Sequence, residues 1–238
     1  MDRTFFQPKI IEDVESKAYR KLTPSQVIQA LAPLLTENRK ARIEDVLAKR
    51  TYNVATVVEH LYDTGNISAV MRTAESFGFL PFHIVEKPEA KYKKSERTSK
   101  GSEKWLDIHK HTDSLSLIQN LKGQGYSVWA TSLDQSVPIH EVDFSQKVAV
   151  VFGNERDGVS PEALSACDGR FQIPMNGFTQ SFNISVAAAL TFYHIYESRR
   201  KLMGESGDLM DDQKDELRAL YFQKTLQSSD KILNGLFE

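Results

Sequence analysis

The pattern of hydrophobic and polar positions changes near residue 50. Before that point, apolar residues between Val27 and Leu35 recur at helical spacing and predict a helix that begins at Thr23-Pro24, followed by a second helix over residues 38–50. After it, short apolar runs alternate with helical patterns. The predicted strands are 54–59, 82–85, 126–131, 147–152 and 170–174, and the predicted helices are 66–77, 113–122, 161–166 and 183–201. This alternation predicts an α/β fold with a mostly parallel sheet and helices on both faces.

The same change predicts three parts. Residues 1–50 form a helical N-terminal extension, residues 51–202 form the α/β domain, and residues 203–238 form a helical tail. Within the α/β domain, the helix over 66–77 is predicted to be capped by Asn66 and closed by Gly78. Residues 87–104 are predicted to be a long loop, and loops of that length are usually functional or mobile.

The composition is that of an ordinary globular protein, with 238 residues, 40% of them hydrophobic and 26% charged. The single cysteine, Cys167, excludes a disulfide framework and a cysteine-based zinc site within the chain. The N-terminus has no apolar signal-peptide core, and no apolar run approaches the ~20 residues of a membrane helix. We therefore expect a cytoplasmic protein with no membrane partner.

The net charge of −2 conceals two basic clusters. Phosphate affinity depends on such local clusters rather than on the total charge, although solvated surface is an equally good explanation of the pattern alone. The first cluster contains Arg39, Lys40, Arg42, Lys49 and Arg50, and the second contains Lys87, Lys91, Lys93, Lys94, Arg97, Lys100 and Lys104.

Candidate chemistry follows the later strands. The polar turn Gly153–Gly158 comes directly after the apolar run 147–152, and Ser181–Ser185 precedes the last long helix. A strand that ends in a glycine-bounded turn marks a place where the backbone comes close to a ligand. Upstream, Asn66 and Arg72 are six positions apart, about 1.7 helical turns, so their side chains point in different directions. Each motif alone could be a cap, a turn or a surface ion pair, and only their order is specific.

This order resembles the three-motif signature of the SpoU-type branch of the SPOUT RNA methyltransferases. The stretches Arg39–Leu47 and Gly101–Trp105 are similar to the tRNA guanosine 2′-O-methyltransferases of that branch, and the similarity covers about residues 38–200. The resemblance implies S-adenosylmethionine-dependent 2′-O-methylation of the D-loop guanosine at tRNA position 18. It also implies a C-terminal deep trefoil knot, a homodimer with the active site at the subunit interface, and no required metal.

The resemblance also implies roles for individual residues. Arg72 is expected to act on the ribose hydroxyl. A guanidinium stays protonated, which favours stabilising an alkoxide or holding a phosphate, but a base role stays open. Asn66, Glu155, Ser181 and Asn183 are expected to arrange Arg72 and the substrate. The expected cofactor-binding residues are Thr131, Gly153, Ile173, Met175 and Phe182, and the expected RNA-binding residues are Arg39, Arg42, Arg50, Lys100 and Lys104.

Two other functions stay open. One is a ribosomal RNA 2′-O-methyltransferase of the same branch, although about 50 residues before the first strand are too few for a separate RNA-binding domain. The other is a catalytically silent RNA-binding module, although such a module has no need of the five residues that the resemblance assigns to catalysis. His109 and His111 are interpreted as surface residues rather than ligands.

Overall fold

The computed structural model describes residues 22–87, 101–204 and 207–235. The chain divides into two compact units, Thr51–Ser206 and a smaller unit that combines Met1–Arg50 with Gly207–Glu238. Each unit is described by itself. The predictions for Lys100 and for most of the second basic cluster lie outside the described residues.

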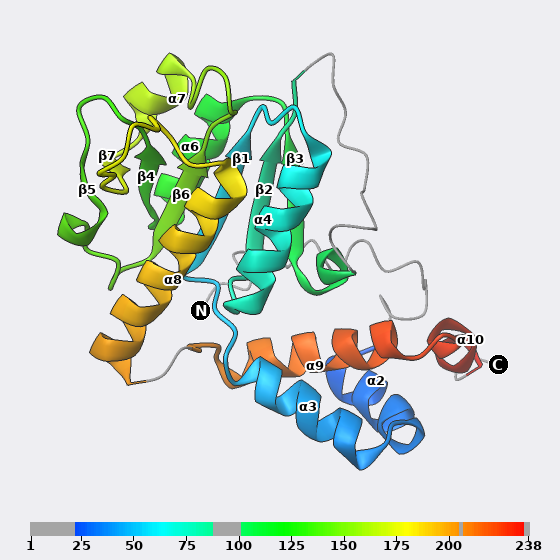
Figure 1. The fold of residues 1–238 in the computed structure, drawn as a ribbon. Helices are drawn as coiled ribbons and strands as arrows, with labels where there is room; N and C mark the ends of the chain where they lie inside the picture. The colour runs from blue at the N-terminus through cyan, green and yellow to red at the C-terminus, as the bar shows by residue number, and fades with distance from the viewer. Residues whose placement is uncertain (1–21, 88–100, 205–206, 236–238) are drawn as a thin grey trace. The chain divides into compact units, whose positions relative to one another are not determined.

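The larger unit is built on a seven-stranded sheet in the order β3-β2-β1-β6-β4-β7-β5 (Figure 1). Every neighbouring pair of strands is parallel. The central strands β1 and β6 are buried along their whole length, which explains why both read as continuous apolar runs. The strands are β1 (Val54–Glu59), β2 (Pro81–Val85), β3 (Asp107–His111), β4 (Ser127–Thr131), β5 (Val137–Pro138), β6 (Val148–Phe152) and β7 (Gly169–Gln172).

Helices cover both faces of this sheet. The core on one face contains residues of α4 (Thr64–Ser76) and α8 (Ile184–Met203), which Figure 1 shows on the near side. The core on the other face contains residues of α6 (Ser114–Gly123) and α7 (Pro161–Ala166). Alternate residues of β1 enter the two cores, as expected for a strand with period 2. Two short 3₁₀ turns, η4 (Ser102–Trp105) and η5 (Ile139–Glu141), complete the unit. The predicted α/β fold is confirmed, whereas the deep trefoil knot stays a prediction.

The edge strands β3 and β5 were not predicted from the sequence. β3 was missed because its sequence is largely polar, and it places His109 and His111 on the same face as His83 of β2. The His83 ring lies 4.9 Å from the His109 ring and 5.2 Å from the His111 ring. His109 and His111, which were interpreted as surface residues, are half-buried against His83 on this edge strand.

Burial, together with the charges of His109 and His111, lowers the pKa of His83 well below its ordinary value. No group of three or more His, Cys, Asp or Glu side chains within the described ranges could hold a metal ion. The three rings pack together at the edge of the sheet.

The smaller unit is helical and brings the two ends of the chain together. Its elements are α2 (Pro24–Leu31), η3 (Ala32–Leu34), α3 (Glu37–Leu47), α9 (Asp211–Thr225) and α10 (Ser229–Asn234). α9 packs against α2 and α3. The Arg218 guanidinium of α9 donates two hydrogen bonds to the Glu44 carboxylate of α3, at 2.5 and 2.8 Å. The sequence pattern predicted helices at both ends but not their packing together. In the described part of the chain, no helix is both long and apolar enough to cross a membrane.

Candidate active site

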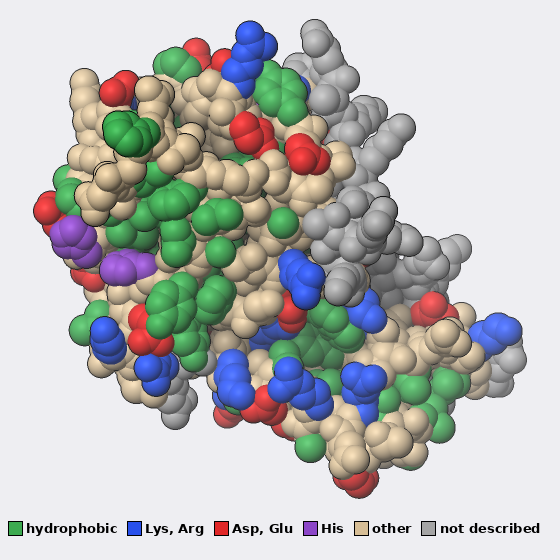
Figure 2. Space-filling view, in the orientation of Figure 1, with side chains coloured by type: hydrophobic (Ala, Val, Ile, Leu, Met, Phe, Trp, Pro, Cys, Tyr) green, Lys and Arg blue, Asp and Glu red, His purple; other side chains and the backbone are tan. Residues whose placement is uncertain are grey.

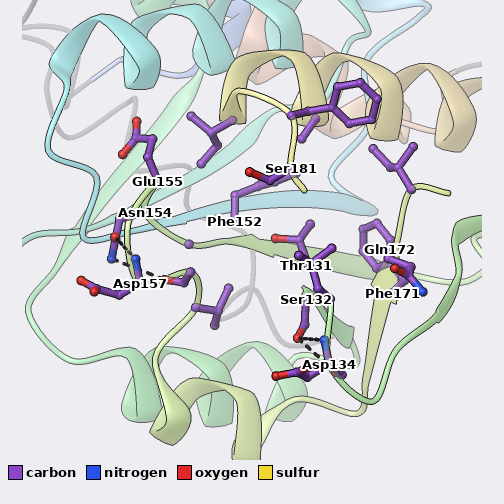
Figure 3. Close-up of a pocket in the computed structure, with 18 of the residues that line it drawn as sticks. Thr131, Ser132, Asp134, Phe152, Asn154, Glu155, Asp157, Phe171, Gln172 and Ser181 are labelled. Atoms are coloured by element: carbon purple, nitrogen blue, oxygen red, sulfur yellow. Dashed lines mark hydrogen bonds between the residues drawn. The ribbon is translucent and has the colours of Figure 1, made fainter. Parts of the chain in front are cut away.

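A pocket of about 630 Å³ lies where β4, β6 and β7 end (Figure 3). Its walls come from four segments far apart in the sequence, 131–134, 152–159, 171–175 and 181–187, together with Leu164. Carboxyl ends of parallel strands meet at one edge of a sheet, where ligands of α/β proteins bind. The five residues expected to bind a cofactor all line this pocket: Thr131, Gly153, Ile173, Met175 and Phe182.

The loop after β6 is fixed by its own hydrogen bonds. The Asn154 side-chain oxygen accepts from the backbone N–H groups of Arg156 at 3.0 Å and Asp157 at 2.8 Å. The backbones of Asn154 and Gly158 also bond to each other in both directions. Gly158 has φ 70°, which favours glycine. Gly153 has no room for a side chain, because a Cβ there would lie 2.0 Å from the backbone carbon of Gly158.

A buried carboxylate holds the far end of this loop. Glu59, the last residue of β1, is 1% exposed and accepts from the Ser160 backbone N–H at 2.7 Å and the Ser160 hydroxyl at 2.8 Å. It also accepts from the hydroxyl of Ser114, in the first turn of α6. Ser160 in turn caps α7. Sequence reasoning missed Glu59, and its only signal was an acidic residue that closes an apolar run, where an unpaired carboxylate is rarely buried.

Three of the residues expected to act in catalysis meet beside the pocket. The Asn66 side-chain amide donates to Glu155 Oε1 at 2.5 Å, and the Asn183 amide donates to Asn66 Oδ1 at 3.5 Å. Asn183 also caps α8 by accepting from the backbone N–H of Ser185 at 2.9 Å. Glu155, Asn183 and Ser181 line the pocket. Asn66, the turn Gly153–Gly158 and the segment Ser181–Ser185 therefore converge on one place.

The predicted cap of α4 was wrong, and the difference explains this network. The N-cap is Asp63, whose carboxylate accepts from the Gly65 N–H at 2.7 Å. Asn66 therefore lies in the first turn of the helix, and its side chain is not used in capping. Because Asp63 satisfies the helix end, Asn66 is available to join Glu155 and Asn183.

Arg72 lies apart from these residues. Its side chain is exposed on α4, and within the described ranges it neither lines the pocket nor hydrogen-bonds to Asn66, Glu155 or Asn183. This agrees with the 1.7-turn separation along the helix.

The residues expected to bind RNA differ in their exposure to solvent. Arg39 and Arg42 are exposed on α3, and Arg42 pairs with Asp45 at 2.8 Å. Lys104 is exposed in η4, with its ammonium 4.6 Å from the centre of the Trp105 ring. Arg50 is 2% exposed, so the structure does not present it to a phosphate. Its place at the end of a helical pattern gave no sign of this burial.

Comparison with known proteins identifies the family to which the chain belongs. The sequence profile described as the SpoU rRNA Methylase family matches residues 53–193. This range exceeds half of the chain, and the chain belongs to this family. It is 37% identical to a tRNA (guanosine(18)-2′-O)-methyltransferase of Borreliella burgdorferi over 210 residues, which are 87% of this chain and 94% of that protein.

Solved structures agree with this assignment. The TrmH/SpoU tRNA modifying enzyme of A. aeolicus matches 80% of this chain and 98% of its own, with 30% identity and a TM-score of 0.72. The SpoU methyltransferase AviRb of Streptomyces viridochromogenes, solved in complex with the cofactor AdoMet, matches 68% of this chain and 62% of its own, with 20% identity and a TM-score of 0.56. At that identity, the second likeness concerns the fold.

Gly153→Ala tests the close approach of backbone in the site. We expect it to lower the free energy of unfolding by about 1–3 kcal/mol, because the added methyl group overlaps the backbone of Gly158 and Val159. Gly177→Ala is the matched control, since its Cβ would meet nothing nearer than Thr179 Oγ1 at 3.8 Å. Urea unfolding measures both variants. Equal midpoints for Gly153→Ala and the native protein would contradict the described packing.

Proposed function

We propose that this protein transfers a methyl group from S-adenosylmethionine to the ribose 2′-hydroxyl of guanosine 18 in the tRNA D-loop. The observation that carries the proposal is the meeting of Asn66, Glu155 and Asn183 beside a pocket that contains every residue expected to bind the cofactor. The match to 94% of the length of a tRNA (guanosine(18)-2′-O)-methyltransferase supports the tRNA substrate over ribosomal RNA. Because tRNA is the substrate, we infer a cytoplasmic location.

The pocket suits this methyl donor in size, polarity and charge. Phe152, Ile173, Met175 and Phe182 supply apolar wall, which a small-molecule site needs together with a few polar groups. The lining contains three carboxylates, Asp134, Glu155 and Asp157, and one basic side chain, Arg156. S-adenosylmethionine has a sulfonium, an ammonium and a carboxylate, so its net positive charge complements this lining. Phe182 is 38% exposed, and we assign its ring to the adenine.

The chain's own residues then have to position and activate the hydroxyl. When bound, S-adenosylmethionine supplies an electrophilic methyl group, so precise placement of the ribose is the main requirement. Glu155 and Asn183 hold the Asn66 amide from two sides, which fixes its orientation toward the site. We assign to Arg72 the stabilisation of the developing alkoxide or the binding of an adjacent phosphate, since a guanidinium stays protonated.

A second copy of the chain would complete this site. Val186, Leu190 and Tyr193 of α8 follow helical spacing and are 45%, 41% and 57% exposed. Figure 2 shows hydrophobic side chains exposed over this part of the molecule. The stripe begins three residues after Asn183, so a partner that covers it lies beside the pocket. We propose a homodimer in which Arg72 of one subunit serves a site that the other subunit shares.

Methyl mapping tests the reaction directly. Unmodified tRNA transcript treated with the protein and labelled S-adenosylmethionine should contain 2′-O-methylguanosine at position 18 by mass spectrometry. A transcript with guanosine 18 replaced should stay unlabelled, and so should a ribosomal RNA transcript. Labelling of the ribosomal RNA would favour a ribosomal RNA 2′-O-methyltransferase of the same family. Tight tRNA binding without any methylation would favour the silent binding module.

Arg72→Lys tests the role of the guanidinium. We expect the rate of methyl transfer to fall about 100-fold or more, because lysine keeps the charge but loses the planar pair of donors. Binding of S-adenosylhomocysteine, measured by calorimetry, should be unchanged, since Arg72 is not part of the pocket. Arg200→Lys, at an exposed arginine paired with Glu197, is the control and should keep native turnover. Native turnover in Arg72→Lys would rule out the assigned role.

Leu190→Glu tests the dimer. We expect light scattering to report a monomer in place of a dimer, because a charge in the centre of the apolar stripe has no partner when buried. Methyl transfer should be lost with the dimer. Leu115→Glu is the matched control, since Leu115 is also 41% exposed but belongs to α6. A dimeric Leu190→Glu variant, or a monomeric native protein, would refute this interface.

A further inference from the structure

An aromatic ring and an ammonium group form a pair at the same edge of the sheet as the pocket. Tyr62 lies in the turn between β1 and α4, four residues before Asn66, and Lys87 lies two residues after the end of β2. β1 and β2 are parallel neighbours with Glu59 opposite Val85. The His60 N–H also donates to the Val85 carbonyl at 3.0 Å. Both residues therefore follow the carboxyl ends of adjacent strands.

The contact between the two side chains is close. Lys87 Nζ lies 4.2 Å from the centre of the Tyr62 ring and donates to the Tyr62 hydroxyl at 2.5 Å. Tyr62 is nevertheless 53% exposed. The partner of Lys87 is a phenol and not a carboxylate, so this contact is not an ion pair. The pair therefore presents an exposed ring and a cation together.

A second lysine–tyrosine pair in the protein has a structural role and serves as a comparison. Lys147 Nζ lies 4.3 Å from the centre of the Tyr126 ring, but Tyr126 is 6% exposed and its hydroxyl donates to the Tyr52 carbonyl. This pair precedes β4 and β6, at the opposite edge of the sheet. Core packing accounts for Tyr126. It does not account for Tyr62.

We propose that Tyr62 and Lys87 form a platform for a single-stranded RNA nucleotide, whose base stacks on the ring and whose phosphate binds the ammonium. Single-stranded RNA is recognised by bases stacked on aromatic side chains together with basic contacts to the backbone. Four residues span at most about 14 Å, so a nucleotide on Tyr62 lies close to the one whose sugar reaches Asn66. The inference rests on the proposed function and adds a specific requirement for an unpaired neighbour of the modified guanosine.

The test compares four variants in tRNA binding, using unmodified transcript at several salt concentrations. Tyr62→Ala should raise the Kd for tRNA at least about fivefold, whereas Tyr62→Phe, which keeps the ring, should stay within about twofold. Lys87→Met should weaken binding and reduce the slope of log K against log salt by about one. Lys147→Met, the matched control, should bind tRNA like the native protein. The Kd for S-adenosylhomocysteine should be unchanged in the Tyr62 and Lys87 variants.

The outcomes separate the platform from the reaction. The platform alone would be overturned if the native protein methylates tRNA and both Tyr62→Ala and Lys87→Met bind tRNA normally. Native protein that binds no tRNA would overturn the proposed function and the platform with it. A change of molecular mass by light scattering in Tyr62→Ala would assign this surface to a subunit contact and would also overturn the platform.

Discussion

The buried carboxylate of Glu59 joins the elements on which the site is built. It ends the central strand β1 and accepts hydrogen bonds from the first turn of α6 and from the cap of α7. The loop that carries Glu155 is therefore fixed at both ends, by Gly153 packed on backbone and by Ser160 bonded to Glu59. A carboxylate buried this deeply is stable only because polar groups satisfy it. The shape of the pocket depends on that satisfaction.

A second dependence concerns the start of α4. The Asp63 carboxylate caps the helix by accepting from the Gly65 N–H, so Asn66, which the pattern suggests as the cap, is left for the site. Asn66 then meets a glutamate 89 positions away and an asparagine 117 positions away. At the start of α8, Asn183 both caps the helix and bonds to Asn66. At α4, one residue caps the helix and another joins the site, whereas at α8 Asn183 does both. Residue type alone does not predict which of these arrangements occurs.

The sequence predicted the parts of the fold and site that depend on local pattern. β1 and β6 were predicted because strands buried on both faces are largely apolar, whereas the pocket residues were expected from the family resemblance, and the structure places all five of them in the pocket. β3 was missed because its polar residues pack against His83 of a neighbouring strand. Such a tertiary contact leaves no local pattern in the sequence. The burial of Arg50 and the joining of the two terminal helical segments depend on tertiary packing in the same way.

The basic side chains of the protein also differ in their partners, which the composition does not show. Lys40 and Arg42 of α3, and Lys49 just after its end, all pair with carboxylates of that helix, so a phosphate that binds them must displace an existing partner. Exposed pairs of this kind contribute little stability, and the exchange costs little, but the gain in phosphate affinity is reduced accordingly. Lys87 contacts a phenol instead, which leaves its charge in place while the ring restricts its position. In the proposed platform, a cation held in this way contributes more to RNA affinity than the net charge of −2 suggests. The proposed RNA contact therefore depends on the position of Lys87 beside the exposed Tyr62 ring.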